Sequence, residues 1–262
     1  MLLNLNQVKQ TLRPNITATT VPNKRLAHLF NDQRRFRQVE EVLPDGSSPW
    51  PITAELGRFL ARAVVKLECR NILEFGAGSS SLVLAQALSL IGGGQLTSVE
   101  QDPEWCADIF DEVKKNKNVD ARLIGSKLSF KMSRKGFYHS YDKAAKIVAE
   151  RGPYDLVLID GPQTFYGRDG GLHLAYQHLA PNALIILDDA KRRGEQFTIQ
   201  RWLQTYPSLD VAKFDPAFSD RGVAVFVNQG HEQPQLSLNS LFTSGCFALK
   251  NWYYRRQLNF AT

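Results

Sequence analysis

Short apolar runs alternate with helical patterns through the middle of this chain. Runs that indicate strands lie at 72–75, 95–100, 121–124, 156–159 and 183–187. Between them, apolar residues recur at the three- and four-residue spacing of amphipathic helices, at 81–90, 103–115, 172–179 and 194–205. Strands that alternate with helices form a mainly parallel sheet through right-handed crossovers, so the pattern predicts an α/β domain.

Two stretches depart from this alternation. The apolar runs 211–214 and 223–227 follow one another with no helical pattern between them. Consecutive strands of this kind pair antiparallel, so a hairpin is expected at the end of the sheet. Residues 126–151 are longer and less regular, and they are expected to form a loop followed by a helix over 141–150.

Both ends of the chain differ in pattern from this core. Residues 1–52 are polar, irregular and interrupted by prolines, which is typical of an extension that acts as a lid or as an arm between subunits. Thr53 is expected to cap a helix that opens the central domain, 53–230. Residues 231–262 are polar and then aromatic, so this tail is expected to pack on the domain or on the partner subunit of a homodimer.

Composition and charge narrow the class of protein. The 262 residues are 43% hydrophobic and 22% charged, the balance of an ordinary globular domain. The net charge of +6 comes from scattered basic residues, which is more typical of solvated surface than of a nucleic-acid site. Three separated cysteines indicate neither a zinc site nor a disulfide framework, which favours the cytoplasm. Because no run approaches the ~20 apolar residues that span a bilayer, no membrane span is expected.

The first predicted strand ends in a glycine loop, Glu74 to Gly78, and serines open the helix that follows. A strand, a glycine turn and a helix N-terminus together bring backbone N–H groups close to a ligand. The third glycine of a dinucleotide fingerprint is absent, so the loop alone is also compatible with a simple tight turn. Glu100 ends the second strand, where a carboxylate can accept hydrogen bonds from both hydroxyls of a ribose. Loop and carboxylate together predict a cofactor that contains adenosine.

Four segments in this order resemble the motifs of class I S-adenosylmethionine (SAM)-dependent methyltransferases. They are ILEFGAG at 72–78, LTSVEQDP at 96–103, YDLVLIDGP at 154–162 and ALIILDD at 183–189. The resemblance covers about 53–230 and implies a seven-stranded, mainly parallel, doubly wound sheet whose last strand is antiparallel. It also implies SAM as the cofactor and methyl transfer as the activity.

The resemblance implies a role for each matching residue. Glu74 would face the methionine amino group of SAM, and Glu100 would hold the ribose. The family often has an acidic residue after the third strand to meet the adenine amine, whereas 123–127 carries no carboxylate, so a backbone group or Ser126 is expected there. The cofactor-binding residues implied in this way are Glu74, Gly76, Ala77, Gly78, Ser79, Glu100, Gln101, Ser126 and Asp160.

Three carboxylates follow the fourth and fifth strands. Asp160 ends one strand, and Asp188 and Asp189 end the next, so all three are expected in the same crevice. Close carboxylates repel one another unless a cation compensates them, and Mg²⁺ with oxygen ligands would do so. The placement resembles that in catechol-type O-methyltransferases, where two Asp and an Asn hold Mg²⁺, with Asp189 at the place of the Asn. Such a metal would bind the acceptor hydroxyl and lower its pKa.

The sequence is also compatible with other roles for these carboxylates. Asp160 and Asp188 could only cap loops and touch the cofactor or water. Arg168, in the loop that follows the fourth strand, could pair with Asp188 in place of a metal, or with an acidic acceptor. His139 and His173 are candidate general bases, although packing is the commoner role of such histidines.

The function expected from these residues is methyl transfer from SAM to an oxygen or nitrogen of a small molecule or sugar. Asp160 and Asp188 are the candidates for removing the acceptor proton. A nicotinamide-dependent oxidoreductase would need the third glycine and a helix between the last two strands. A nucleic-acid methyltransferase would favour an Asn/Asp-Pro-Pro-aromatic segment or a catalytic cysteine where the sequence has DGPQ at 160–163. A nucleic-acid or protein methyltransferase and a catalytically inactive SAM-binding subunit remain the alternatives.

Overall fold

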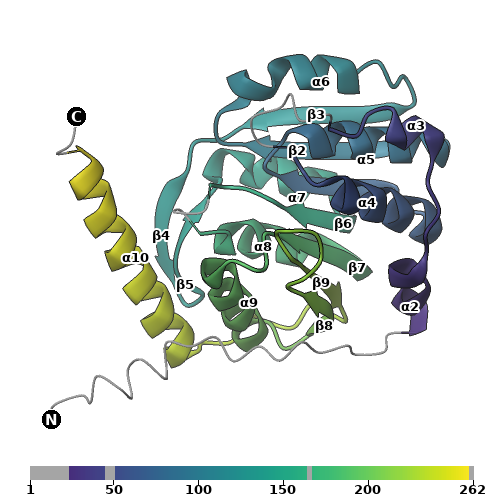
Figure 1. Ribbon diagram of the computed structural model, residues 1–262. Coiled ribbons are helices and arrows are strands. Elements are labelled where there is room, and N and C mark those ends of the chain that lie inside the picture. The colour runs from purple at the N-terminus through teal and green to yellow at the C-terminus, as the bar shows by residue number, and fades with distance from the viewer. Residues whose placement is uncertain (1–23, 45–50, 164–166, 260–262) are drawn as a thin grey trace, which may run out of the picture.

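A twisted seven-stranded sheet forms the centre of the molecule (Figure 1). The computed structural model describes residues 24–44, 51–163 and 167–259. The strand order is β3-β2-β1-β6-β7-β9-β8. The strands are β1 (Asn71–Phe75), β2 (Gly94–Glu100), β3 (Val119–Gly125), β6 (Tyr154–Ile159), β7 (Leu179–Asp188), β8 (Leu209–Asp215) and β9 (Val223–Asn228). Strand β9 is antiparallel to both of its neighbours, and the other pairs are parallel. The predicted fold and the terminal hairpin are therefore confirmed.

Helices cover both faces of this sheet because neighbouring strand residues point to opposite sides. Ile72 of β1 packs in a core with α4 (Ala54–Leu67), α5 (Ser79–Leu90) and α6 (Ala107–Val113). Leu73, the next residue, packs in a second core on the other face. The helices on that face are α7 (Ala145–Arg151), α8 (Asp169–Ala175) and α9 (Arg193–Thr205).

The described part of the N-terminal extension packs against the domain. Helices α2 (Lys24–Asn31) and α3 (Arg37–Glu40) bring Leu26, Leu29 and Val39 into the core beside α4. Thr53 caps α4 as predicted, since its side chain accepts a hydrogen bond from the Leu56 backbone N–H at 3.2 Å. Residues 1–23 and 45–50 lie outside the described residues, so the lid or arm role stays a prediction.

The stretch expected to begin as a loop contains a hairpin, and that part of the prediction is wrong. Strands β4 (Ser129–Ser133) and β5 (Gly136–Ser140) pair antiparallel before the predicted helix begins. The hairpin is supported by long-range contacts, among them a hydrogen bond from the backbone N–H of Phe137 to the hydroxyl of Ser244 in α10 (Leu238–Asn259) at 3.1 Å. A partner about a hundred residues away leaves no local signal at the hairpin itself.

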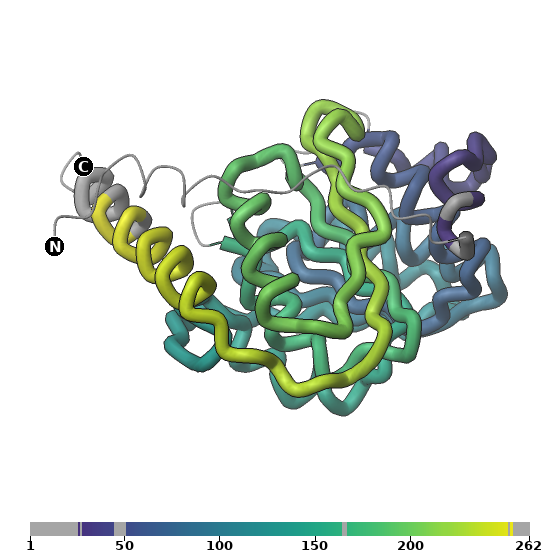
Figure 2. The backbone as a smooth tube through the Cα atoms, turned by 90° about the horizontal axis from the view of Figure 1, so that it is seen from below, coloured from purple at the N-terminus to yellow at the C-terminus, as the bar shows by residue number. Residues whose placement is uncertain are grey.

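Helix α10 extends from the hairpin side of the domain, away from the central sheet (Figure 2). Its first half contacts β5 and α9, while Leu249, Trp252 and Tyr253 in its second half are exposed. The tail therefore packs on the domain over part of its length, and a partner subunit stays a prediction. Within the described ranges, no helix is long and apolar enough to cross a membrane.

Candidate cofactor and acceptor site

A cavity of ≈ 550 Å³ opens at the carboxyl ends of β1, β2, β6 and β7. Parallel strands place their C-terminal loops at one edge of the sheet, which is where open α/β folds bind ligands. The cavity is lined by Ile52, Gly76, Ala77, Gly78, Ser79, Ser80, Glu100, Gln101, Asp102, Trp105, Asp160, Gly161, Pro162, Gln163, Arg168, Asp189, Arg192 and Arg221. Most of the residues predicted for the cofactor and the acceptor are therefore brought together.

The glycine loop depends on glycine for a measurable reason. Gly76 has a φ of +92°, and a Cβ added there would lie 2.6 Å from the backbone nitrogen of Gly161. The loops after β1 and β6 thus approach each other more closely than any side chain allows. This contact brings Asp160 next to the loop expected to hold the cofactor.

Glu74 lies behind this loop and is absent from the described lining of the cavity. Its carboxyl accepts hydrogen bonds from the hydroxyls of Ser80, Ser81 and Ser98, the last two at 2.6 Å. Burial raises the pKa of Glu74 to about 7. Ser80, which bonds Glu74, does line the cavity, and the contact of Glu74 with the methionine amino group stays a prediction.

Glu100 lines the cavity at the end of β2. Its Oε1 accepts hydrogen bonds from the backbone N–H groups of Gln101 at 2.7 Å and Asp102 at 3.0 Å, and its Oε2 from that of Ala77 at 3.1 Å. Burial raises the pKa of this carboxyl. The backbone fixes the carboxylate at the mouth of the glycine loop, as a ribose contact requires.

Ser126 is placed close to Glu100 but outside the described lining. Its backbone N–H donates to the Glu100 carbonyl at 2.8 Å. The Ser126 hydroxyl is buried and has no hydrogen-bond partner among the described residues. Its contact with adenine stays a prediction.

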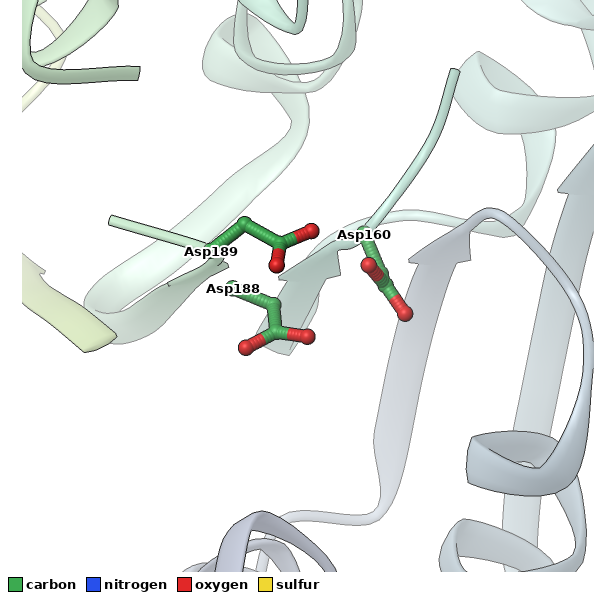
Figure 3. A group of neighbouring side chains, drawn as sticks. All are labelled: Asp160, Asp188 and Asp189. Atoms are coloured by element: carbon green, nitrogen blue, oxygen red, sulfur yellow. The ribbon is translucent and has the colours of Figure 1, made fainter. Parts of the chain in front are cut away.

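Asp160, Asp188 and Asp189 converge beside the glycine loop (Figure 3). Each offers a carboxylate oxygen, and these oxygens lie within 4.8 Å of one another. Adjacent strand residues normally point to opposite faces. Asp189, however, has a left-handed φ of +60°, which turns its side chain toward the same space. This backbone turn explains how two consecutive residues both approach Asp160.

The three carboxylates differ in exposure and proton affinity. Asp160 keeps 20% of its side chain exposed and lines the cavity, whereas Asp188 is buried and is absent from the described lining. Burial, and then the neighbouring carboxylates, raise the pKa of Asp188 to about 8. Burial raises the pKa of Asp160 to about 6, although the charge of Arg168 opposes this.

Arg168 reaches all three aspartates from the loop that precedes α8. Its Nη2 donates to Oδ1 of Asp160 at 3.0 Å and to Oδ2 of Asp189 at 2.8 Å. Its Nη1 donates to the backbone carbonyl of Asp188 at 2.8 Å, rather than to the side chain expected from the sequence. The guanidinium is almost fully buried, so these contacts are poorly screened by water.

Further residues of the site were missed at the sequence level. Arg192 forms an ion pair with Asp189 at 2.6 Å. Its position three residues after Asp189 was the sequence feature that could have predicted this pair. Arg221 comes from the connection between β8 and β9 and donates to the Pro51 carbonyl at 2.8 Å, a placement that only the folded sheet defines. Trp105 and Gln163 also line the cavity.

The two histidines considered as general bases lie elsewhere. Nδ1 of His173 is 2.7 Å from the hydroxyl of Tyr206, and burial lowers the pKa of His173 to about 3. His139 stands in β5, with its ring centroid 5.6 Å from that of Phe130. Neither is among the described residues that line the cavity, so packing is the role their positions support.

Comparison with known proteins agrees with this fold. A family model described as a methyltransferase domain matches residues 73–190, which hold the glycine loop, Glu100 and all three aspartates. A catechol O-methyltransferase of Niastella koreensis is 28% identical over 172 residues, or 63% of this chain and 70% of that protein.

Two solved structures share the fold at low sequence identity. An O-methyltransferase from Bacillus cereus in complex with SAH (S-adenosylhomocysteine) is 18% identical, with a TM-score of 0.53 over 77% of this chain and 94% of that one. The O-methyltransferase TomG from Streptomyces achromogenes, in complex with SAM, is 17% identical, with a TM-score of 0.52 over 75% of this chain and 92% of that one. Residues 73–190 therefore match a methyltransferase domain, and the chain shares the fold of O-methyltransferase structures that hold SAH and SAM.

Proposed function

We propose that this enzyme transfers the methyl group of SAM to a hydroxyl oxygen of a small molecule, and that Asp160 accepts the hydroxyl proton. The observation that carries the proposal is the single cavity shared by the glycine loop, Glu100 and Asp160. The Niastella koreensis relative, named a catechol O-methyltransferase, supports oxygen as the acceptor atom and a small molecule as the substrate.

The cofactor would lie along the ends of β1 and β2. Glu100 would accept hydrogen bonds from the ribose hydroxyls, with Gln101 beside it. The loop from Gly76 to Ser80 would hold the methionine part, because it lines the cavity at the start of α5 and helix N-termini favour polar and anionic ligand groups. Glu74 would act indirectly, by fixing the serines of this loop.

The acceptor would lie against Asp160. Its oxygen attacks the methyl carbon, the bond from that carbon to the sulfonium sulfur breaks, and SAH leaves with the electron pair on sulfur. The hydroxyl proton passes to Asp160, whose pKa of about 6 leaves it mostly ionised and still basic at neutral pH. The chain thus supplies alignment and a proton acceptor, and the sulfonium supplies the activation.

The sequence also predicted a divalent metal, held by Asp160, Asp188 and Asp189. The three aspartates have the oxygen chemistry that Mg²⁺ prefers, and Asp188 Oδ2 and Asp189 Oδ1 are buried without a hydrogen-bond partner among the described residues. The space between Asp160 and Asp189, however, is taken by Nη2 of Arg168. The residues as arranged do not fit a metal ion, and no step of the proposed reaction uses one.

The proposal is tested by methyl transfer from radiolabelled SAM to a panel of phenols, catechols, sugars and aromatic amines. Labelled product from hydroxyl compounds, with SAH formed in equal amount, is the expected result. Transfer only to amines, nucleic acid or protein would contradict the proposed acceptor. Cofactor binding without transfer to any of these would favour a catalytically inactive SAM-binding subunit. A cytoplasmic location and a homodimer also stay predictions.

A further inference from the structure

Arg168 is an arginine buried among carboxylates rather than a surface cation. Only 4% of its side chain is exposed, and its guanidinium donates to the loop carbonyl of Pro162 as well as to the three aspartates. A guanidinium keeps its proton under all physiological conditions, so this positive charge is permanent. The cluster therefore contains a fixed cation of its own.

The position of this cation is the one a metal would need. A divalent ion binds carboxylate oxygens at 2.0–2.6 Å. Nη2 of Arg168 lies 3.0 Å from Oδ1 of Asp160 and 2.8 Å from Oδ2 of Asp189, and it donates to both at once. An ion ligated by the same two oxygens would lie within contact distance of Nη2 and would be repelled by its charge. Arg168 and a metal ion ligated by these two oxygens are thus mutually exclusive.

The surrounding structure keeps Arg168 in place. The next residue, Asp169, is buried and binds Arg201 of α9 through two hydrogen bonds of 2.6 Å. This ion pair fixes the start of α8, from which Arg168 extends. The carbonyl of Asp188 holds the other side of the guanidinium at 2.8 Å. To leave the carboxylates, Arg168 would have to give up this bond and both of its bonds to the aspartate side chains.

We propose that Arg168 is the built-in cation of this site and that it takes the place of a divalent metal, so that the enzyme neither needs nor binds one there. Asp189 fits this arrangement, because its carboxylate pairs with Arg168 and Arg192 together. Arg168 is also a positioning residue, since it fixes the oxygen of Asp160 that lies beside the cavity. This second role rests on the proposed function, whereas exclusion of the metal does not.

The test is a calorimetric titration of the full-length protein with Mn²⁺ and Mg²⁺, which reports cation binding without any methyl transfer. Wild type is compared with Asp188→Asn, which removes one candidate ligand. Equal binding in the two proteins, or no binding in either, is expected. A site with a Kd at or below about 1 mM that is present in wild type and lost in Asp188→Asn would overturn the proposal.

A second test removes Arg168 and measures whether the protein gains a cation site. Arg168→Met should gain a Mn²⁺ site that is absent from wild type, because it frees Oδ1 of Asp160 beside Oδ2 of Asp188 and Oδ1 of Asp189, which have no hydrogen-bond partner among the described residues. Arg168→Lys retains the charge and should gain none, and Arg122→Met, at an exposed arginine of β3, is the matched control. A folded Arg168→Met protein that gains no site would overturn the claim that arginine fills a cation position. If that variant does not fold, the comparison of wild type with Asp188→Asn decides alone.

Discussion

Nη2 of Arg168 lies 3.0 Å from Oδ1 of Asp160, and the same nitrogen lies 2.8 Å from Oδ2 of Asp189. One buried guanidinium thus joins the carboxylates at the ends of two neighbouring strands, β6 and β7. It contacts Asp160, the residue that lines the cavity and whose pKa is raised to about 6 by burial.

Asp160→Asn should abolish proton acceptance while leaving the cofactor bound. We expect kcat to fall by about 10²–10⁴-fold, the usual contribution of a general base, with SAH affinity nearly unchanged. Steady-state kinetics and calorimetry on the same preparations measure the two effects. Asp210→Asn, at an exposed position of β8, is the control. Turnover of Asp160→Asn close to that of wild type would remove Asp160 from the reaction.

Glu100→Ala should weaken cofactor binding, because ribose hydroxyls in the cavity would lose their acceptor. The expected loss is about 1–3 kcal/mol, or about 5- to 150-fold in the Kd for SAH. Glu104→Ala, four residues later and exposed, should leave the Kd unchanged. Equal affinities of the two variants, measured by calorimetry, would show that the ribose lies elsewhere.

Gly76→Ala should both destabilise the protein and abolish SAH binding. An added Cβ would meet the Gly161 backbone nitrogen at 2.6 Å, at a residue whose φ is already +92°. Gly92→Ala is a matched control, because Gly92 has a φ of +87° but nothing within 4 Å of an added Cβ. The control should lose only the ~1–2 kcal/mol of backbone strain, as measured by urea unfolding. A Gly76→Ala protein no less stable than Gly92→Ala would contradict the close approach of the two loops.

The raised pKa of Glu74 predicts a pH-dependent difference between wild type and Glu74→Gln. The folded pKa of about 7 exceeds the ordinary glutamate pKa of 4.5, so the folded state binds the proton more tightly. The stability that this proton confers is fully present below pH about 4.5 and is lost as pH rises to about 7. Between those limits wild type should lose up to about 3 kcal/mol relative to Glu74→Gln, whose amide does not titrate.

Urea unfolding of both proteins at several pH values measures this difference. The contributions of the other carboxyls with raised pKa values largely cancel in this difference, because both proteins contain them. A difference in unfolding free energy that does not change with pH would show that Glu74 has an ordinary pKa.

The ion pair between Asp169 and Arg201 should contribute strongly to stability. Both side chains are buried, so Arg201→Met would leave an uncompensated carboxylate, at a cost of about 3–5 kcal/mol. Arg122→Met removes an exposed arginine that pairs with Asp120 and should cost less than about 1 kcal/mol. Comparable losses in the two variants, from chemical denaturation, would contradict a structural role for the buried pair.

Much of this site could be predicted from the sequence, because its parts lie at strand ends. Apolar runs mark the strands, and parallel strands bring their C-terminal ends to one edge. Glu100, Asp160 and Asp189 therefore line one cavity as expected. The loop lacks the third glycine of a dinucleotide fingerprint, so the sequence did not explain why glycine is needed there. The close approach of Gly76 to Gly161 supplies a steric explanation.

The features that the sequence did not reveal depend on tertiary contacts. The hairpin is bonded by Ser244 of a distant helix, and Arg221 reaches the cavity from the connection between the last two strands. Glu74 occupies the expected strand end, yet its carboxyl is taken up by serine hydroxyls behind the loop. Which partner a buried polar group finds is set by packing in three dimensions, and the local pattern does not encode it.

The most direct test of the proposed site is a crystal structure of the protein with SAH. The ribose hydroxyls should lie within hydrogen-bond distance of Glu100, and the sulfur should face the open side chain of Asp160. Arg168 should still bridge Asp160 and Asp189, with no metal between them. SAH bound outside this cavity, or with its sulfur turned away from Asp160, would contradict the proposed reaction.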